Sequence, residues 1–292
     1  MDALIIGVML GGVYALASVG FVIIYSSTKV LNFAYGEMIM LGAYLTFLFL
    51  DQIGGIPAPI AILLTIISMV AFSFIVERII LRQLIGRSTI FNTIMVTIGL
   101  AMVMRGVVRI IWTSENRVMS PIVPLSPIVL GPFSITPIYL FGLSLLIIIL
   151  GGLAIFLKKA IAGVAMRAVS NDEMGAYSIG INIPRMLVLA WGLAGVTAAF
   201  AGIVLANLGL LSLGLKDLLV VVFAAVVLGG LESIKGAVIG GMVIGLVTSF
   251  SAAYLDSFTG WPISFIMPMV VLVILILVRP YGLWGVEVIE RL

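Results

Sequence analysis

The residue types that most often carry catalysis or hold metal ions are missing from this chain. Its 292 residues include no histidine and no cysteine. Imidazole and thiolate groups are therefore excluded, both as metal ligands and as members of Ser-His or Cys-His nucleophile pairs. The Gly-x-Gly-Asp string of intramembrane aspartyl proteases does not occur either. We expect no catalytic residue and no metal site, so any chemistry must come from the few charged and polar side chains.

Charged residues are scarce throughout the chain. The sequence holds 15 Lys and Arg and 12 Asp and Glu, so 9% of residues are charged and 63% are hydrophobic. A soluble domain carries about a quarter of its residues as charged groups. The composition therefore excludes a soluble enzyme and predicts a polytopic membrane protein in a lipid bilayer. The net charge of +3 is too small to indicate binding to nucleic acid.

A short polar link separates the first two apolar segments. It carries five residues that we take as candidates for a translocation pathway, near the inner side of the membrane: Asn32, Phe33, Tyr35, Gly36 and Glu37. Ionisable groups inside a bilayer face protein or water because exposure to lipid is costly. Two roles are open for the Glu37 carboxylate, an ion pair with Lys29 or a place in the wall of the pathway.

Two other charged groups lie near apolar segments. Arg105 and Arg109 are four residues apart, on one helical face near the predicted outer mouth. They either extend to the membrane surface or receive a docked binding protein. Lys216 and Asp217 open a short apolar segment, and we expect them to form a pair at a helix end.

Apolar runs that could cross a bilayer recur along the chain. A helix needs roughly 20 apolar residues to cross about 30 Å of hydrocarbon. Segment 218–230 is short for this, and is either a tilted crossing or a re-entrant segment. We predict an all-α polytopic membrane protein with eight or nine transmembrane helices in a single domain over residues 1–292. The candidate segments are Asp2–Tyr25, Ala34–Leu50, Pro59–Ile80, Thr89–Trp112, Thr136–Leu157, Met186–Leu208, Leu218–Gly230, Gly236–Leu255 and Pro262–Val278.

The basic residues predict an orientation, because cytoplasmic loops are enriched in Lys and Arg. With residues 158–185 in the cytoplasm, the N-terminus lies outside and the C-terminus lies in the cytoplasm. Arg78, beside Glu77, is then an ordinary cytoplasmic anchor. The inside set is Lys29, Arg78, Arg82, Arg87, Lys158, Lys159, Arg167, Arg185, Lys235, Arg279 and Arg291, against an outside set of Arg105, Arg109, Arg117 and Lys216.

Glycine and proline give two further expectations. The pairs Gly7–Gly11, Gly236–Gly240 and Gly241–Gly245 are each spaced by four residues, which places small residues on one helical face. This spacing predicts tight helix packing, or alternatively helix faces that slide during transport. Segment 113–135 carries Pro121, Pro124, Pro127 and Pro132, which prevent a helix there and predict an irregular cap.

The longest break between apolar segments on the basic side is the segment 158–185, which we call the coupling segment. Ser170 or Asn171 can cap a short helix whose first turn carries Asp172 and Glu173. Side-chain oxygens at the cap accept from free backbone N–H groups, and acidic residues suit the positive end of the helix dipole.

The same helix has a predicted end and a predicted apolar face. Gly180 suits the left-handed position after a helix, Ile181 follows it, and Pro184 bars helix before the next span. Met174 and Tyr177 share one face with Ile181. Two interpretations are open, a helix that rests on lipid headgroups and a projection that contacts a cytoplasmic partner.

These residues carry a resemblance to a known family. Glu173, Gly180, Ile181, Ile183 and Pro184 resemble the coupling-loop motif of ABC-transporter permeases, although Met174 and Gly175 replace the two alanines that follow the glutamate. Three more stretches agree in order and spacing: VLNFAYGEMIMLGAYL at 30–45, GGLESIKGAVIGG at 229–241 and RPYGLWG at 279–285. Over nearly its whole length the chain is similar to branched-chain amino acid permeases of the LivH type.

The resemblance implies a set of partners. Such a permease works with a second, LivM-like permease, two cytoplasmic ABC ATPase subunits and an external substrate-binding protein, in the inner (cytoplasmic) membrane. The chain has no G-x-x-x-x-G-K-[ST] string, so ATP and Mg²⁺ are expected on the ATPase subunits and no cofactor on this chain. The residues implied in ATPase coupling are Asn171, Asp172, Glu173, Met174, Tyr177, Gly180, Ile181 and Pro184.

The function implied by the resemblance is ATP-driven import of branched-chain amino acids. Permeases for urea or short amides are similar, so these solutes form the alternative. An ion-coupled secondary transporter is a third class, and it requires ion-binding helix breaks near the midplane. Only Glu37 and Asp217 approach that position, and both are predicted at helix ends.

Overall fold

The structure is a computed structural model that describes residues 2–84, 89–124, 126, 128–130, 133–209, 211–279 and 282–284. Arg87, Pro127, Pro132, Arg291 and part of the stretch 279–285 lie outside the described residues. The helices are α1 (Asp2–Thr28), α2 (Tyr35–Phe47), α3 (Ala58–Val76), α4 (Ile90–Trp112), α5 (Pro137–Lys159), α6 (Ile161–Asn171), α7 (Glu173–Ser178), α8 (Ile183–Leu208), α9 (Leu218–Gly229), α10 (Ile234–Phe250), α11 (Ser257–Thr259) and α12 (Ile263–Val278).

Four tighter or wider turns extend these helices. A π-helical turn continues α2, α3 and α10, as η1 (Leu48–Gln52), η2 (Glu77–Leu81) and η4 (Ser251–Asp256) respectively. A 3₁₀ turn, η3 (Leu213–Asp217), comes directly before α9. The π turns let α3 and α10 continue as longer apolar helices, which reach Leu81 and Thr259.

Six helices of the described chain are long and apolar enough to cross a membrane: Ala3–Thr28, Ala58–Leu81, Phe91–Trp112, Leu140–Lys159, Ile183–Leu208 and Ile234–Thr259. The chain is therefore a polytopic helical membrane protein. This number is below the eight or nine predicted, because three predicted spans form shorter helices. Those are α2 with 13 residues, α9 with 12 and α12 with 16.

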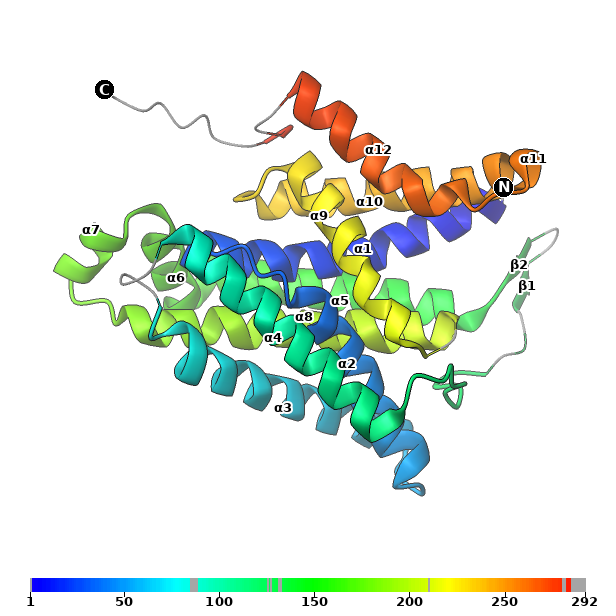
Figure 1. The fold of residues 1–292 in the computed structure, drawn as a ribbon, viewed down its shortest axis with the longest axis horizontal. Coiled ribbons are helices and arrows are strands. Elements are labelled where there is room, and N and C mark those ends of the chain that lie inside the picture. Colours follow the sequence, from blue (N-terminus) through cyan, green and yellow to red (C-terminus); the bar gives the residue numbers. More distant parts are fainter. Residues whose placement is uncertain are drawn as a thin grey trace.

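α1 is the central helix of the fold. It packs against α5, α8, α9 and α10 (Figure 1), and its residues from Gly11 to Ile24 are buried. Glycine allows the closest of these contacts. A Cβ on Gly241 would overlap the backbone of Ala15, and a Cβ on Gly245 would overlap the backbone of Gly11. The prediction of tight packing at the glycine pairs is confirmed here.

The outward faces of α4, α5 and α12 are apolar. Ile110 is 84% exposed, Ile148 67% and Leu277 79%. Aliphatic side chains need no polar partner in hydrocarbon, and beyond the first turn the backbone N–H groups of a helix are used within it. These faces suit contact with lipid or with another apolar helix.

The proline-rich segment before α5 contains a short β-hairpin that was not predicted. Ile128–Leu130 (β1) and Phe133–Ile135 (β2) form a short antiparallel hairpin, with Ile128 opposite Ile135. Arg117 also pairs with Leu211 through two backbone hydrogen bonds of 2.9 Å. The prediction of a wholly irregular cap is therefore wrong for the hairpin, because prolines exclude helix but leave extended pairing possible.

Candidate functional site

α2 begins in the interior of the fold. After α1 ends at Thr28, the chain turns back among the helices. The Phe33 N–H donates to Thr97 Oγ1 at 3.3 Å, and the Tyr35 hydroxyl lies 3.0 Å from Thr197 Oγ1. Both threonines lie within long helices, α4 and α8. The first turn of α2 is therefore held at the depth of helix interiors, and Figure 1 shows α2 leaving the middle of the molecule.

α9 begins beside the same point. Gly36 approaches the carbonyl oxygen of Lys216 and the side chain of Leu219 so closely that a Cβ would not fit. The starts of α2 and α9 therefore touch. We call residues 31–37 and 213–219 together the helix junction. The short segment predicted at 218–230 is confirmed as a helix, and its start lies at this junction.

The Glu37 carboxylate pairs with Arg105 across the junction. Arg105 Nη2 lies 2.6 Å from Glu37 Oε1. Arg105 is 15 residues after the start of α4 at Ile90 and 7 before its end at Trp112, or about 22 Å and 10 Å at the helical rise. This pair therefore lies well inside a helix long enough to cross the bilayer.

For each of these charges, one of the two alternatives left open by the sequence is wrong. Lys29 does not pair with Glu37 but with Glu232, with 2.6 Å between Lys29 Nζ and Glu232 Oε1. Arg105 is directed to Glu37 instead of extending to the end of α4. Both errors have one cause, which is that residues 29–34 carry Glu37 away from the end of α1 and into the helix interior.

The Glu37–Arg105 pair is incompletely satisfied. Glu37 Oε2 and Arg105 Nε are buried and have no hydrogen-bond partner among the described residues. A buried charged group that lacks part of its hydrogen bonds destabilises the fold. Such a pair in a membrane helix is retained where charge is needed for function.

The other polar residues of the junction differ in burial, because Asn32 is buried while Lys216 and Asp217 are partly exposed. The Asn32 Oδ1 accepts from the Ala34 N–H at 3.0 Å, and this side chain is 1% exposed. Lys216 Nζ lies 2.5 Å from Asp217 Oδ1, so the predicted pair at a helix end is confirmed. Of the five pathway candidates, only Phe33 is partly exposed. Their role in a pathway stays a prediction.

The coupling segment folds as two helices where one was predicted. α6 precedes α7, and Asn171 is the last residue of α6. The cap of α7 is Asp172, whose Oδ1 accepts from the Gly175 N–H at 3.0 Å. Ser170 and Asn171 are therefore wrong as caps, because both remain helical and only Asp172 has the extended backbone that a cap requires.

The predicted end of this helix is confirmed at Gly180. Its φ is +85°, which favours glycine. The Gly180 N–H donates to the Tyr177 carbonyl at 3.0 Å, and the Ile181 N–H donates to the Ala176 carbonyl at 3.1 Å. This is the Schellman pattern, and it turns the chain sharply toward α8.

α8 begins earlier than predicted. Asn182 caps it by accepting from the Arg185 N–H at 3.1 Å, and Ile183 is its first residue. Pro184 therefore lies in the first helical turn, where its missing N–H costs nothing, instead of separating the loop from the span.

α7 projects from one end of the molecule, opposite α11 (Figure 1). Its large side chains face away from the chain, with Met174 82% exposed, Tyr177 72% and Ile179, just after the helix, 75%. Glu173 is exposed as well, and Ala176 is the buried contact. A small helix with an uncovered apolar surface is available for contact with another surface.

Sequence reasoning missed the role of Glu77. This side chain is completely buried and pairs with Arg82, while Arg78 lies over the Phe74 ring at 5.8 Å. The Arg82 Nη2 also lies 3.4 Å from the carbonyl oxygen of Pro184. The anchor at Arg78 stays a prediction, and for the buried pair of Glu77 the available signal was a glutamate on an apolar helix.

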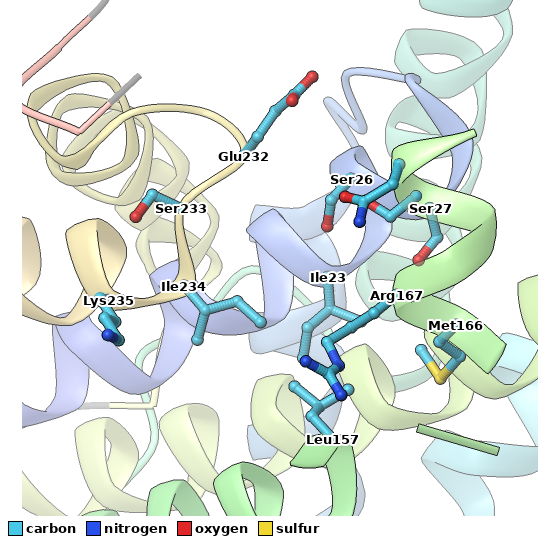
Figure 2. Close-up of a pocket in the computed structure, with 12 residues that line it drawn as sticks. Ile23, Ser26, Ser27, Leu157, Met166, Arg167, Glu232, Ser233, Ile234 and Lys235 are labelled. Carbon is cyan, nitrogen blue, oxygen red and sulfur yellow. The ribbon is translucent and has the colours of Figure 1, made fainter. Parts of the chain in front are cut away.

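An open cavity of about 410 Å³ lies beside α6. Figure 2 shows the end of α1 between α6 and the loop that precedes α10. The lining combines apolar, polar and charged side chains. The lining residues are Ile23, Ser26, Ser27, Leu157, Met166, Arg167, Ser170, Asn171, Glu232, Ser233, Ile234 and Lys235.

Long apolar helices, two short helices that start inside the fold and an ion pair at that depth define a multi-pass membrane transport protein. Broken helices with charged groups near mid-membrane are typical of this class. The chain belongs to the family described as branched-chain amino acid transport system / permease component, whose model matches residues 3–278. This family match agrees with the resemblance seen in the sequence motifs.

Relatives span nearly the full length of this chain. It is 28% identical to the high-affinity branched-chain amino acid transport system permease protein BraD of Pseudomonas aeruginosa, over 100% of this chain and 97% of that protein. It is 28% identical to LivH of Escherichia coli K12, over 98% and 95%. A probable LivH of Methanocaldococcus jannaschii is 27% identical, over 93% and 88%.

Among solved structures, PsaBC from Streptococcus pneumoniae in complex with Fab aligns with 97% of this chain and 93% of that chain. The sequence identity is 16% and the TM-score is 0.47. The family assignment rests on the sequence matches.

Proposed function

We propose that this chain is the permease subunit of an ATP-driven importer of branched-chain amino acids. The observation that carries this proposal is the family match over residues 3–278. Relatives named for branched-chain amino acid transport favour these solutes over urea or short amides. They also favour a subunit of an ABC importer over an ion-coupled secondary transporter.

The energy for import comes from other subunits. The chain has no G-x-x-x-x-G-K-[ST] phosphate-binding string, so two ABC ATPase subunits hold ATP and Mg²⁺ and this chain holds no cofactor. The exposed face of α7, with Met174 and Tyr177, sits in a groove of one ATPase subunit. Closure of the ATPase pair on ATP moves α7 and, through the turn at Gly180, the start of α8.

The orientation follows from the distribution of basic residues. The end with α7 faces the cytoplasm of the cell, the N-terminus faces outward, and an external substrate-binding protein docks on the outer end. Residues 1–292 form one permease domain in the inner membrane. Eight or nine segments enter the bilayer, with α2 and α9 as partial crossings, and a second LivM-like permease completes the pathway.

The pathway runs past the helix junction. Asn32, Phe33, Tyr35, Gly36 and Glu37 lie where α2 begins, beside the start of α9. In support, this is the place where the described chain carries an ion pair deep within a long apolar helix. Charge there suits a water-filled route better than contact with lipid.

The coupling assignment is tested by substitutions in the coupling segment. The complete complex, in lipid vesicles with binding protein and ATP, is compared with complexes that carry Glu173→Lys or Gly180→Trp. We expect insertion in the membrane to be normal, and uptake and stimulated ATP hydrolysis to be lost. Glu232→Gln is the control, because Glu232 is an exposed acidic residue that lies outside the coupling segment. Normal uptake with both coupling variants would refute the assignment.

The solute is tested in the same vesicles. Uptake of leucine, isoleucine, valine and urea is measured with the unmodified complex. Uptake of the three amino acids supports the proposed substrate class, and uptake of urea alone would overturn it.

A further inference from the structure

The two ion pairs of the helix junction present opposite charges at the surface. In the first pair, the Arg105 side chain is 38% exposed and the Glu37 side chain 3%. In the second pair, Asp217 is 45% exposed and Lys216 23%. The more exposed member is therefore a guanidinium in one pair and a carboxylate in the other. Each is held by a less exposed partner of the opposite charge.

Both pairs belong to one small region. Gly36 contacts the carbonyl oxygen of Lys216 so closely that no side chain would fit between α2 and η3. Glu37 follows Gly36 in the chain, and Asp217 follows Lys216. The backbone contact therefore places the two ion pairs in neighbouring segments, with residues from α4, α2 and η3.

The surroundings of this region are apolar. Met102 and Val103, on α4 near Arg105, are 66% and 63% exposed. A guanidinium at this depth is expensive to expose to hydrocarbon. The face is therefore suited to a water-filled route or to another protein surface.

The chemistry of the face matches an aliphatic amino acid. An arginine fork binds a carboxylate through two parallel hydrogen bonds, and an aspartate accepts from an ammonium group. We propose that Arg105 and Asp217 form a transient contact site for the carboxylate and ammonium groups of the transported solute. The proposal rests on the proposed function, because it requires that the solute is an amino acid.

The less exposed partners act as positioning residues. Glu37 orients the Arg105 guanidinium through the 2.6 Å hydrogen bond, and Lys216 holds Asp217. Arg105 and Asp217 each already have an ionic partner in the protein. The amino acid therefore replaces Glu37 or Lys216 as that partner and does not neutralise a free charge. The site is therefore weak, as release toward the cytoplasm requires, and neutral urea gains little from it.

The test uses the complete complex in vesicles, with saturating binding protein and ATP. Leucine uptake and ATP hydrolysis are measured together for Asp217→Asn and for the double variant Glu37→Gln with Arg105→Gln. The double variant removes both charges of the buried pair, so no unpaired carboxylate is left inside the fold. We expect leucine uptake per ATP hydrolysed to fall by at least about tenfold in both, as for loss of a charge-assisted contact.

Glu232→Gln is the matched control. Glu232 is also 45% exposed and also pairs with a lysine, but it lies in the turn between α9 and α10 and outside the junction. We expect this variant to keep the leucine uptake per ATP hydrolysed of the unmodified complex. Arg105→Lys keeps the positive charge but not the planar guanidinium. Its leucine uptake per ATP hydrolysed should lie between the values of the unmodified complex and the double variant.

The outcomes separate the two proposals. An unmodified complex that does not take up leucine would overturn the proposed function. If the unmodified complex takes up leucine, and if Asp217→Asn and the double variant take up as much leucine per ATP hydrolysed, the contact site alone is overturned. Equal loss of uptake and ATP hydrolysis would also overturn it, because that result indicates a purely structural role.

Discussion

The guanidinium of Arg82 donates two hydrogen bonds to the carboxylate of Glu77, at 3.2 Å from Nε and 3.1 Å from Nη2. The backbones of the same two residues are also bonded, because the Arg82 N–H donates to the Glu77 carbonyl at 2.8 Å. The five-residue spacing is that of the π turn η2. This turn closes the end of α3 next to the start of α8.

Removal of the Glu77 charge should destabilise the permease. We expect Glu77→Gln to lower the free energy of unfolding by about 1 kcal/mol, because the partly exposed Arg82 guanidinium loses two charge-assisted hydrogen bonds but keeps access to water. Thermal unfolding in detergent measures this. Arg78→Gln is the control, since Arg78 is exposed, and it should change stability by less than about 0.5 kcal/mol. Equal melting temperatures for both variants would contradict the prediction.

The packing of α1 on α10 should not tolerate a methyl group at Gly241. A Cβ there would overlap the Ala15 backbone, so we expect Gly241→Ala to cost about 1–3 kcal/mol of stability by overpacking. Gly99→Ala is the matched control, because nothing lies within 4 Å of a Cβ at Gly99 in α4. Thermal unfolding of the two variants compares them directly. A tolerated Gly241→Ala would show that the two helices are not in close contact.

The bond between Tyr35 and Thr197 should fix the start of α2 to α8. We expect Tyr35→Phe to cost about 1 kcal/mol, because the buried Thr197 hydroxyl loses a partner. A double-mutant cycle with Thr197→Val isolates the pair. Tyr44→Phe is the control, since the Tyr44 hydroxyl is buried and has no partner in the described chain. That variant should be neutral or stabilising, and the reverse ranking of the two tyrosines would refute the prediction.

The cap of α7 should decide whether this helix stays folded. We expect Asp172→Ala to cost about 1 kcal/mol of local stability, because the Gly175 N–H loses its acceptor. Hydrogen exchange of residues 173–178 measures the effect. Asp172→Asn keeps an acceptor oxygen and should retain protection. Faster exchange in Asp172→Asn than in Asp172→Ala would be inconsistent with capping.

Features that depend on composition or on neighbouring residues were predictable from the sequence. The scarcity of charge indicates a membrane protein, and the long apolar runs indicate the six long helices. The turn at Gly180 was also predictable, because a Schellman ending needs only a glycine and its near neighbours. The glycine pairs of α1 and α10 indicated close packing through their spacing alone.

Predictions of helix ends were wrong where the sequence offered nearly equivalent positions. Ser170, Asn171 and Asp172 are all good cap residues, so their order alone does not select one. The choice depends on where α6 ends, and α6 is fixed by burial of Gly163, Met166 and Val169 against the rest of the chain. Pro184 is similarly compatible with a loop and with a first helical turn.

Only the tertiary structure decided which charges meet. Glu37 and Arg105 are 68 residues apart in the chain, and Lys29 was the nearer partner by sequence. The pairing depends on the return of residues 29–34 into the helix interior. This part of the chain is held by the hydrogen bond from Phe33 to Thr97 of α4 and by the contact of Gly36 with η3. Composition and periodicity are properties of single segments, whereas an ion pair between segments depends on how they pack. The sequence therefore determined a helical membrane permease, and packing alone placed its charges at the helix junction.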